Sequence, residues 1–324
     1  MAPSANCSSL RPVHTADNAA TKAAPLGAET ELPPWIDRHK ALARLAETQL
    51  FFIGGAPRSG TTWLQQICDS HPDVCCQGEG LFLNHLAVPL EKMMIERAKV
   101  IDGKNKQIFK HTGGYPIPLV DDVEFLAGTA ILLALAQQAG DRSYKALGEK
   151  TPENVFHFEK LIALFPTAKF IAIARDPRDV LTSAWHFFRK PTARDESRET
   201  KLDFIRTALP SISDGARKML AFGERHPDSY FQLTYERLCA GPAPVVTRLF
   251  KFLGVSAEPT IVDAALSQTA FAKQTAGRPK GIAENGAFFR KGSVGDWPST
   301  LTPEMNDMVI GELGWMFPHF GWKI

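Results

Sequence analysis

The sequence predicts an α/β fold, a single domain in which a parallel β-sheet is flanked by helices. Two short apolar runs, LFFI at residues 50–53 and KFIAIA at residues 169–174, have the pattern of strands buried on both faces. A helical pattern follows each run within a few residues, and alternating strands and helices indicate a parallel sheet covered on both sides. The 324 residues, 44% of them hydrophobic, have the composition of one large domain.

The two best-defined helices each follow one of these strands. After the first strand, Trp63, Leu64, Ile67 and Cys68 recur at helical spacing and predict a helix over residues 62–70. After the second strand, the Asp-Pro pair at residues 176–177 is typical of a helix start. The apolar stripe of that second helix consists of Val180, Leu181, Ala184, Trp185 and Phe188.

Weaker patterns complete the predicted domain. Residues 230–235 predict a third strand, and residues 242–253 and 303–316 predict helices. The region of residues 86–140 is predicted to be a mostly helical insertion with a turn at Gly113-Gly114.

The N-terminal residues differ in composition from the remainder. Residues 1–45 are predicted to be a mostly disordered tail with an initial helix, and residues 46–324 the folded domain, because the tail is rich in Ala, Ser, Thr and Pro. The tail has no hydrophobic block of the secretory kind, although an organellar targeting role stays open.

Composition also limits the cellular setting and the partners. The apolar stretch at residues 125–136 is far shorter than the roughly 20 residues of a membrane helix, so no membrane association is expected. Five cysteines without a CxxC pair favour neither a disulfide framework nor a zinc site, and a cytoplasmic location follows. A net charge of +2 is too small to predict binding of nucleic acid, so any anion site must be a local cluster of basic residues.

The segment GAPRSGTT at residues 55–62 predicts a phosphate-binding loop between the first strand and its helix. It has the two glycines of a P-loop at the usual spacing, but Thr61 stands where nucleotide kinases have lysine, and the positive charge is on Arg58. Backbone N–H groups and the positive end of the helix can bind an anion without that lysine. The fold is therefore predicted to be P-loop nucleotide-binding-like.

These residues, with four later blocks, resemble the family of sulfotransferases that use 3′-phosphoadenosine-5′-phosphosulfate (PAPS). The blocks are the PRSGTTW loop at residues 57–63, RDPRDVLTS at residues 175–183, Tyr235-Glu236, TAF at residues 269–271, and RKGSVGDW at residues 290–297. The resemblance implies in-line transfer of a sulfuryl group from PAPS to a hydroxyl or amine of a small-molecule acceptor. It also implies release of adenosine 3′,5′-bisphosphate (PAP) and no required metal.

The resemblance assigns most of the predicted site to the nucleotide. Arg58 would steady the leaving group, Arg175 and Ser183 would hold the 3′-phosphate, and the remaining residues would enclose the adenine and phosphates. Arg suits phosphate because its guanidinium can donate two parallel hydrogen bonds. The predicted nucleotide-binding residues are Arg58, Ser59, Gly60, Thr61, Thr62, Trp63, Arg175, Ser183, Tyr235, Thr269, Phe271, Arg290, Lys291 and Gly292.

The catalytic base differs from the cytosolic pattern of this family. Those enzymes commonly carry Lys-Thr-His, whereas this chain has Lys150-Thr151-Pro152. Carbohydrate and protein-tyrosine branches instead use a Glu after the phosphate-loop helix, where this chain has Glu79. The predicted catalytic set is Glu79 as base, with Lys150 and Arg58 stabilising charge on the bridging oxygen.

Rival bases and rival functions remain open at this point. His111 and His186 are the alternative bases. A P-loop kinase is the first alternative function, which Thr61 opposes, and a PAPS- or bisphosphate-binding protein without activity is the second, which Pro152 favours. The acceptor and the oligomeric state are not determined, and residues 81–144 are expected to build the acceptor pocket and a lid.

Overall fold

The computed structural model describes residues 34–45, 48–188 and 197–324. Residues 1–33 of the predicted tail therefore lie outside the described residues. The helix expected near the end of residues 1–45 is α1, Pro34–Leu45. In the part of the chain that the structure describes, no helix combines the length and apolar character of a membrane span.

The predicted parallel sheet is present and has five strands in the order β2-β3-β1-β4-β5. All neighbouring strands pair in parallel. The strands are β1 (Gln49–Gly55), β2 (Val74–Cys76), β3 (Ala146–Lys150), β4 (Lys169–Ala174) and β5 (Tyr230–Thr234). The prediction of a single α/β domain with a parallel sheet flanked by helices is confirmed.

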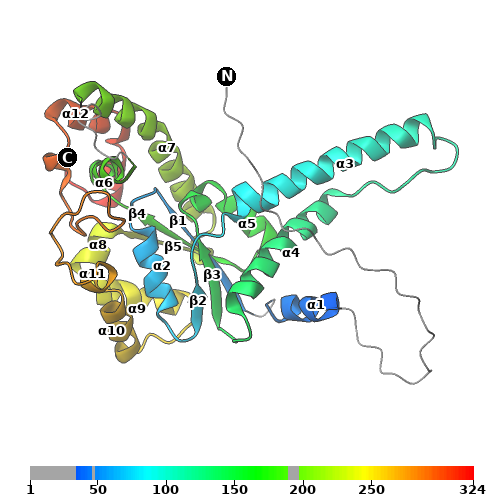
Figure 1. Ribbon diagram of the computed structural model, residues 1–324, viewed down its shortest axis with the longest axis horizontal. Coiled ribbons are helices and arrows are strands. Elements are labelled where there is room, and N and C mark those ends of the chain that lie inside the picture. The colour runs from blue at the N-terminus through cyan, green and yellow to red at the C-terminus, as the bar shows by residue number, and fades with distance from the viewer. Residues whose placement is uncertain (1–33, 46–47, 189–196) are drawn as a thin grey trace, which may run out of the picture.

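Helices cover both faces of the sheet (Figure 1). The α-helices beyond α1 are α2 (Thr61–Asp69), α3 (Val88–Gln107), α4 (Val120–Ala139), α5 (Phe158–Leu164), α6 (Pro177–Phe188), α7 (Arg198–Arg225), α8 (Tyr235–Ala240), α9 (Pro242–Phe252), α10 (Pro259–Gln268), α11 (Phe271–Gln274), α12 (Pro303–Leu313) and α13 (Met316–Phe320). Shorter helical turns are η1 (Phe82–Ala87), η2 (Pro152–Phe156), η3 (Pro227–Ser229) and η4 (Trp297–Ser299).

Side chains of the central strands alternate between two hydrophobic cores, one on each face of the sheet. Phe51 and Ile53 of β1 point into a core shared with α2, α9 and α10, whereas Phe52 points into a core shared with α4, α5, α7 and α12. Because both faces are buried, β1 and β4 have no polar side chain after their first residue, which is why the sequence revealed them.

The sequence missed two of the five strands. Strand β2 has only three residues, and β3 has the sequence ALGEK, which carries two charged side chains and a glycine. All five residues of β3 are nevertheless buried, because Glu149 and Lys150 find hydrogen-bond partners inside the protein. A strand whose burial depends on distant partners leaves no apolar pattern in the sequence.

The predicted helical insertion is a long hairpin formed by α3 and α4, and Gly113 and Gly114 both have positive φ in the turn between them. Figure 1 shows the hairpin projecting from the edge of the domain. The C-terminal helix predicted over residues 303–316 is interrupted: α12 ends at Leu313 and α13 begins at Met316.

Candidate active site

The predicted phosphate-binding loop joins β1 to α2 at the carboxyl edge of the sheet, where ligands of parallel α/β folds bind. Gly60, the residue before α2, has a φ of 100°, and a Cβ there would lie 2.7 Å from the Tyr235 ring. Only glycine fits this position without strain. Arg58 also has a positive φ, 74°, and the Ser59 hydroxyl is buried without a hydrogen-bond partner in the described structure.

A cavity of about 380 Å³ lies over this loop and collects nearly all of the predicted site residues. Ser59 and Lys150 are the exceptions, although Lys150 contacts two lining residues. The predicted residues that line the cavity are Arg58, Gly60, Thr61, Thr62, Trp63, Glu79, Arg175, Ser183, Tyr235, Thr269, Phe271, Arg290, Lys291 and Gly292. Segments more than 200 residues apart in the sequence therefore meet in one site.

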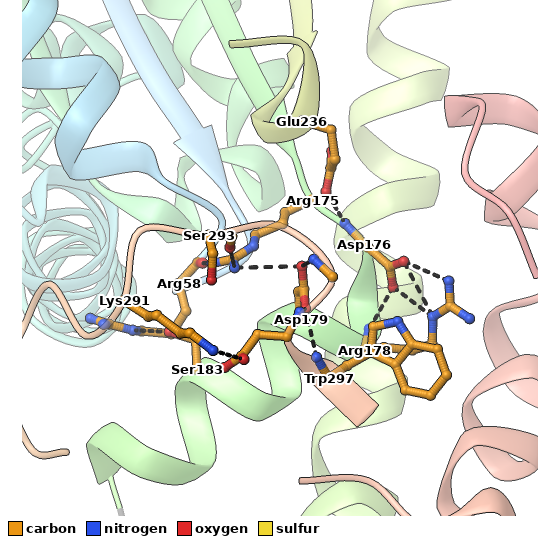
Figure 2. A network of polar contacts seen from close by, with 12 residues as sticks. Arg58, Arg175, Asp176, Arg178, Asp179, Ser183, Glu236, Lys291, Ser293 and Trp297 are labelled. Atoms are coloured by element: carbon orange, nitrogen blue, oxygen red, sulfur yellow. Dashed lines mark hydrogen bonds and ion pairs between the residues drawn. The ribbon is translucent and has the colours of Figure 1, made fainter. Parts of the chain in front are cut away.

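Arg175 follows β4 and points toward the phosphate loop (Figure 2). Its two terminal nitrogens donate to the backbone oxygens of Arg58, at 3.2 Å, and Ser293, at 3.0 Å. Its guanidinium lies 4.3 Å from the ring centre of Tyr235, and its Nε is buried without a partner in the described structure. The buried, incompletely bonded guanidinium is suited to receive an anion.

Arg178, only three residues later, takes no part in the cavity. Its guanidinium pairs with the Asp176 carboxylate at 2.7 Å and lies 4.4 Å from the ring centre of Trp297. Figure 2 shows it pointing away from Arg175. The cluster of basic residues that the sequence shows at Arg175 and Arg178 thus divides into one cavity residue and one structural residue.

Asp179 holds the late basic loop in place, a function that the sequence did not reveal. Its fully buried carboxylate accepts hydrogen bonds from the backbone N–H groups of Gly295 at 2.7 Å, Asp296 at 2.9 Å and Trp297 at 3.0 Å (Figure 2). This anchoring joins the start of α6 to the end of the RKGSVGDW block. The sequence did not indicate this function, because an Asp in the first turn of a helix is common wherever a negative charge stabilises the helix dipole.

The same loop places two basic side chains beside the cavity. Arg290 and Lys291 both pair with Asp296. Burial alone would raise the pKa of the Asp296 carboxyl, but hydrogen bonds and charges from Lys291 and Arg290 hold that pKa below its usual value. Asp296 therefore remains ionised and orients both cations.

Aromatic residues form one wall of the cavity. The Trp63 indole donates to the backbone oxygen of Thr269 at 3.1 Å, and its ring centre lies 5.9 Å from that of Tyr235. Gly292 has a φ of 68°, and a Cβ there would lie 2.5 Å from the Phe271 ring. The basic loop and the aromatic wall are thus in direct contact.

The predicted catalytic pair Glu79 and Lys150 is brought together by the fold. The Lys150 ammonium forms an ion pair with the Glu79 carboxylate and donates to the Thr62 hydroxyl at 3.1 Å. The Lys150 side chain is 3% exposed, whereas the Glu79 side chain is 44% exposed and lines the cavity. One buried cation therefore connects the phosphate loop with an accessible carboxylate.

Glu149, the residue before Lys150, fixes the segment that carries Glu79, and the sequence did not single it out. Its buried carboxylate accepts from the Gly80 backbone N–H at 2.8 Å and from the Asn154 amide at 2.8 Å. Burial raises the pKa of this carboxyl, despite hydrogen bonds from Thr151, Asn154 and Gly80 that lower it.

Arg58 lies away from the Glu79–Lys150 pair. Its Nε donates to the Ser183 hydroxyl at 3.3 Å, and its guanidinium lies between the rings of Phe187 and Phe288, 4.3 and 4.8 Å from their centres. Burial, together with the charges of Arg175 and Arg290, lowers the pKa of Arg58 to about 10. An anion bound among these three guanidinium groups would relieve their repulsion.

The cavity lining differs from the sequence expectations for His111, His186 and residues 81–144. His186 contacts Thr300 at 3.1 Å, and neither His186 nor the exposed His111 lines the cavity. No residue of the described segment 81–144 lines this cavity either: α3 and α4 of that segment form the projecting hairpin, and an acceptor pocket and lid built by the segment stay a prediction. Near Arg58, the cavity wall is formed instead by Phe187, Phe188 and Phe288, which the sequence analysis did not assign to the site.

The structure is a P-loop-like α/β fold whose cavity brings basic side chains and aromatic rings together. The family model described as "Sulfotransferase family" matches residues 51–259, and the chain belongs to that family.

Several relatives fit this membership. The chain is 28% identical over 206 residues to a putative protein-tyrosine sulfotransferase of Caenorhabditis briggsae, covering 63% of this chain and 65% of that protein. It is 30% identical over 165 residues to cytosolic sulfotransferase 16 of Arabidopsis thaliana, covering 44% and 48%. The chain thus spans less than two thirds of the length of these relatives.

Solved structures share the fold at low sequence identity. Mouse sulfotransferase SULT7A1, complexed with PAP, aligns with a TM-score of 0.51 at 18% identity, covering 86% of this chain and 88% of that one. Sulfotransferase STF9 from Mycobacterium avium aligns with a TM-score of 0.53 at 14% identity, covering 90% and 81%.

Proposed function

We propose that this protein is a sulfotransferase that moves a sulfuryl group from PAPS to an acceptor and releases PAP. The observation that carries the proposal is that one cavity brings together the loop before α2 and a group formed by Arg175, Ser183 and the Arg290-Lys291 loop, which would bind two separate anionic groups. PAPS carries anionic groups at both its 5′ and 3′ positions. An ordinary nucleotide would leave the second site without a ligand.

The hydrogen-bonding capacity of the cavity supports this assignment. Among the described residues that line the cavity, buried donors without partners are Arg175 Nε, Arg290 Nε and Ser293 Oγ. Buried polar groups without partners are costly, so a ligand that accepts from them gains affinity. Trp63, Tyr235 and Phe271 would enclose the adenine between the two sites.

The catalytic step would use the Glu79–Lys150 pair. Glu79 would take the proton of the acceptor hydroxyl or amine as the acceptor atom bonds to sulfur. The bond from sulfur to the bridging oxygen breaks, and that oxygen keeps the electron pair. Lys150, buried beside Thr62 of the phosphate loop, would stabilise the negative charge that forms there.

The role predicted for Arg58 would need a change of side-chain conformation. From its present position at Ser183 and Phe288, its guanidinium would have to turn toward the 5′ side to contact the leaving group. Alternatively, from the present position it would assist Arg175 and Ser183 at the 3′-phosphate. In both positions Arg58 contributes positive charge to the bound nucleotide.

We further propose a small-molecule acceptor bearing a hydroxyl or amine. The wall near Arg58 and Glu79 includes Phe187, Phe188, Phe288 and Pro152, which favour a compact apolar body over an extended charged chain. A cytoplasmic location is also proposed, and the four cysteines in the described residues, all free, are in keeping with a reducing compartment.

Two measurements test the function. PAP should raise the melting temperature strongly, with a stabilisation of about 2.7 kcal/mol at a hundredfold excess over its Kd, whereas ATP with magnesium should have little effect. Incubation with ³⁵S-labelled PAPS and pooled hydroxyl and amine metabolites should then give labelled products. A larger shift with ATP and magnesium would indicate a kinase, and PAP binding without transfer to any acceptor would indicate a binding protein.

A further inference from the structure

The α3–α4 hairpin carries an exposed apolar surface that the proposed function does not use. None of the 20 residues of α3, all of which the structure describes, is buried. The exposed apolar side chains are concentrated in the distal part, residues 104–126, which we call the hairpin tip (Figure 1). They are Ile108, Phe109, Tyr115, Ile117, Leu119, Val120, Phe125 and Leu126.

This exposure is unusual for the sequence of α4. The helix is apolar around most of its circumference, which is typical of a helix covered on all sides. Its proximal half buries Ala127, Gly128, Ile131 and Leu135 against the domain, yet Phe125, one turn earlier, is 69% exposed. A cluster of exposed aromatic and aliphatic side chains marks an interaction surface.

The hairpin tip is organised by its own hydrogen bonds. The Asn105 amide donates to the Tyr115 backbone oxygen at 2.8 Å, and the Tyr115 N–H donates to the Asn105 side-chain oxygen at 2.9 Å. The Asp122 carboxylate accepts from the Leu119 N–H at 2.8 Å, which caps the start of α4. An ordered surface loses little conformational entropy on docking.

The charges of the hairpin tip indicate which partner fits. Three lysines lie at the end of α3 and just beyond it, and three acidic residues lie at the start of α4, so the tip has no net charge. They are Lys104, Lys106 and Lys110 on one arm, and Asp121, Asp122 and Glu124 on the other. An anionic membrane or a nucleic acid would be attracted by the basic arm and repelled by the acidic arm, so the tip offers it no net electrostatic attraction. A surface with both signs side by side is complementary to a second copy related by a twofold axis.

We propose that two copies of this chain form a dimer through their hairpin tips, with the basic arm of each facing the acidic arm of the other and the apolar side chains between them. In a twofold interface each such contact occurs twice. One charge reversal therefore creates two repulsive contacts in a homodimer. Opposite reversals on the two partners create two attractive contacts in a heterodimer.

Sedimentation velocity on the full chain tests the dimer. The unchanged protein should dimerise, and Phe125→Glu should raise the dimer dissociation constant at least about tenfold with an unchanged melting temperature of the monomer. Ile324→Glu is the matched control, since Ile324 is an equally exposed apolar residue far from the hairpin tip, and it should have no effect on dimerisation. A protein that is monomeric at every concentration, or a dimer that Phe125→Glu leaves intact, overturns the proposal.

Charge reversal tests the arrangement of the arms. Lys104→Glu/Lys110→Glu and Asp121→Lys/Glu124→Lys should each weaken self-association at least about tenfold, and an equal mixture of the two should form heterodimers. These substitutions leave Asp122 in place, so the hydrogen bond from the Leu119 N–H that caps α4 is kept. A mixture that stays monomeric contradicts the proposed pairing, as would monomers that bind to phosphatidylserine vesicles through the same apolar side chains.

Discussion

At the scale of single residues, the buried carboxylates of Asp179 and Glu149 are directed at backbone N–H groups rather than only at cations. Asp179 accepts from three successive amides of the basic loop, and Glu149 accepts from the amide beside Glu79. A buried carboxylate without such partners would be strongly destabilising. These residues therefore position the RKGSVGDW loop and the segment that carries Glu79.

Glu79→Gln tests the proposed base. Turnover should fall about 100-fold or more, because Gln cannot accept the acceptor proton, while the affinity for PAP should not weaken. Glu153→Gln is the matched control: Glu153 lines the same cavity, and its variant should keep normal turnover. Steady-state rates with labelled PAPS and calorimetric titration with PAP give the two quantities. Near-normal turnover of Glu79→Gln would remove Glu79 from the mechanism.

Asp179→Asn should weaken PAP binding about tenfold or more. The Asn amide oxygen can accept hydrogen bonds but the amide nitrogen cannot, so at least one of the three loop N–H groups would lose its acceptor. Each unsatisfied buried group costs about 1–3 kcal/mol. Asp176→Asn is the control, because Asp176 pairs with Arg178 outside the cavity, so its variant should lose stability but retain affinity. The comparison uses calorimetric Kd values together with melting temperatures. Equal losses of affinity in both variants would contradict the anchoring role.

At the scale of elements, the RKGSVGDW loop is shaped by two glycines in the left-handed region. Gly292 and Gly295 have φ values of 68° and 74°. A Cβ at Gly292 would meet the Phe271 ring at 2.5 Å, whereas a Cβ at Gly295 would have no heavy atom within 4 Å among the described residues. Both positions therefore need a residue that tolerates positive φ, but only Gly292 lies against another side chain.

Gly292→Ala and Gly295→Ala therefore form a matched pair. Both should lose about 1–2 kcal/mol of loop stability from the backbone conformation. Only Gly292→Ala should displace Phe271, and its affinity for PAP should fall about tenfold further than that of Gly295→Ala. Equal affinities of the two variants, measured by calorimetry, would show that the contact between Gly292 and Phe271 does not contribute to PAP binding.

At the scale of the whole molecule, the aromatic core behind the sheet supports the site from a distance. Phe222 of α7 is 1% exposed, with its ring centre 4.8 Å from Phe170 of β4 and 5.2 Å from Phe158 of α5. It thereby joins a long helix to the strand that Arg175 directly follows.

Phe222→Ala should reduce the free energy of unfolding by about 3–5 kcal/mol, because it leaves a cavity in this core. The affinity for PAP, measured well below the melting temperature, should stay the same. Ile324→Ala, at an exposed position, should change stability by less than about 0.5 kcal/mol. A small loss of stability in Phe222→Ala, measured by urea unfolding, would contradict the assignment of Phe222 to the core.

The sequence by itself determined the α/β class, three of the strands and the phosphate loop of this protein, because these features depend on local patterns. Strands buried on both faces usually have long apolar runs, as β1 and β4 do, and the loop needs glycine at residue 60, where φ is positive and the Tyr235 ring lies close. The tertiary structure alone decided that β3 is a buried strand, that Asp179 and Glu149 anchor the site, that Arg58 lies between two phenylalanines, and that α3 and α4 project away from the cavity. Each of these depends on contacts between residues far apart in the chain, which leave no periodic signal in the sequence.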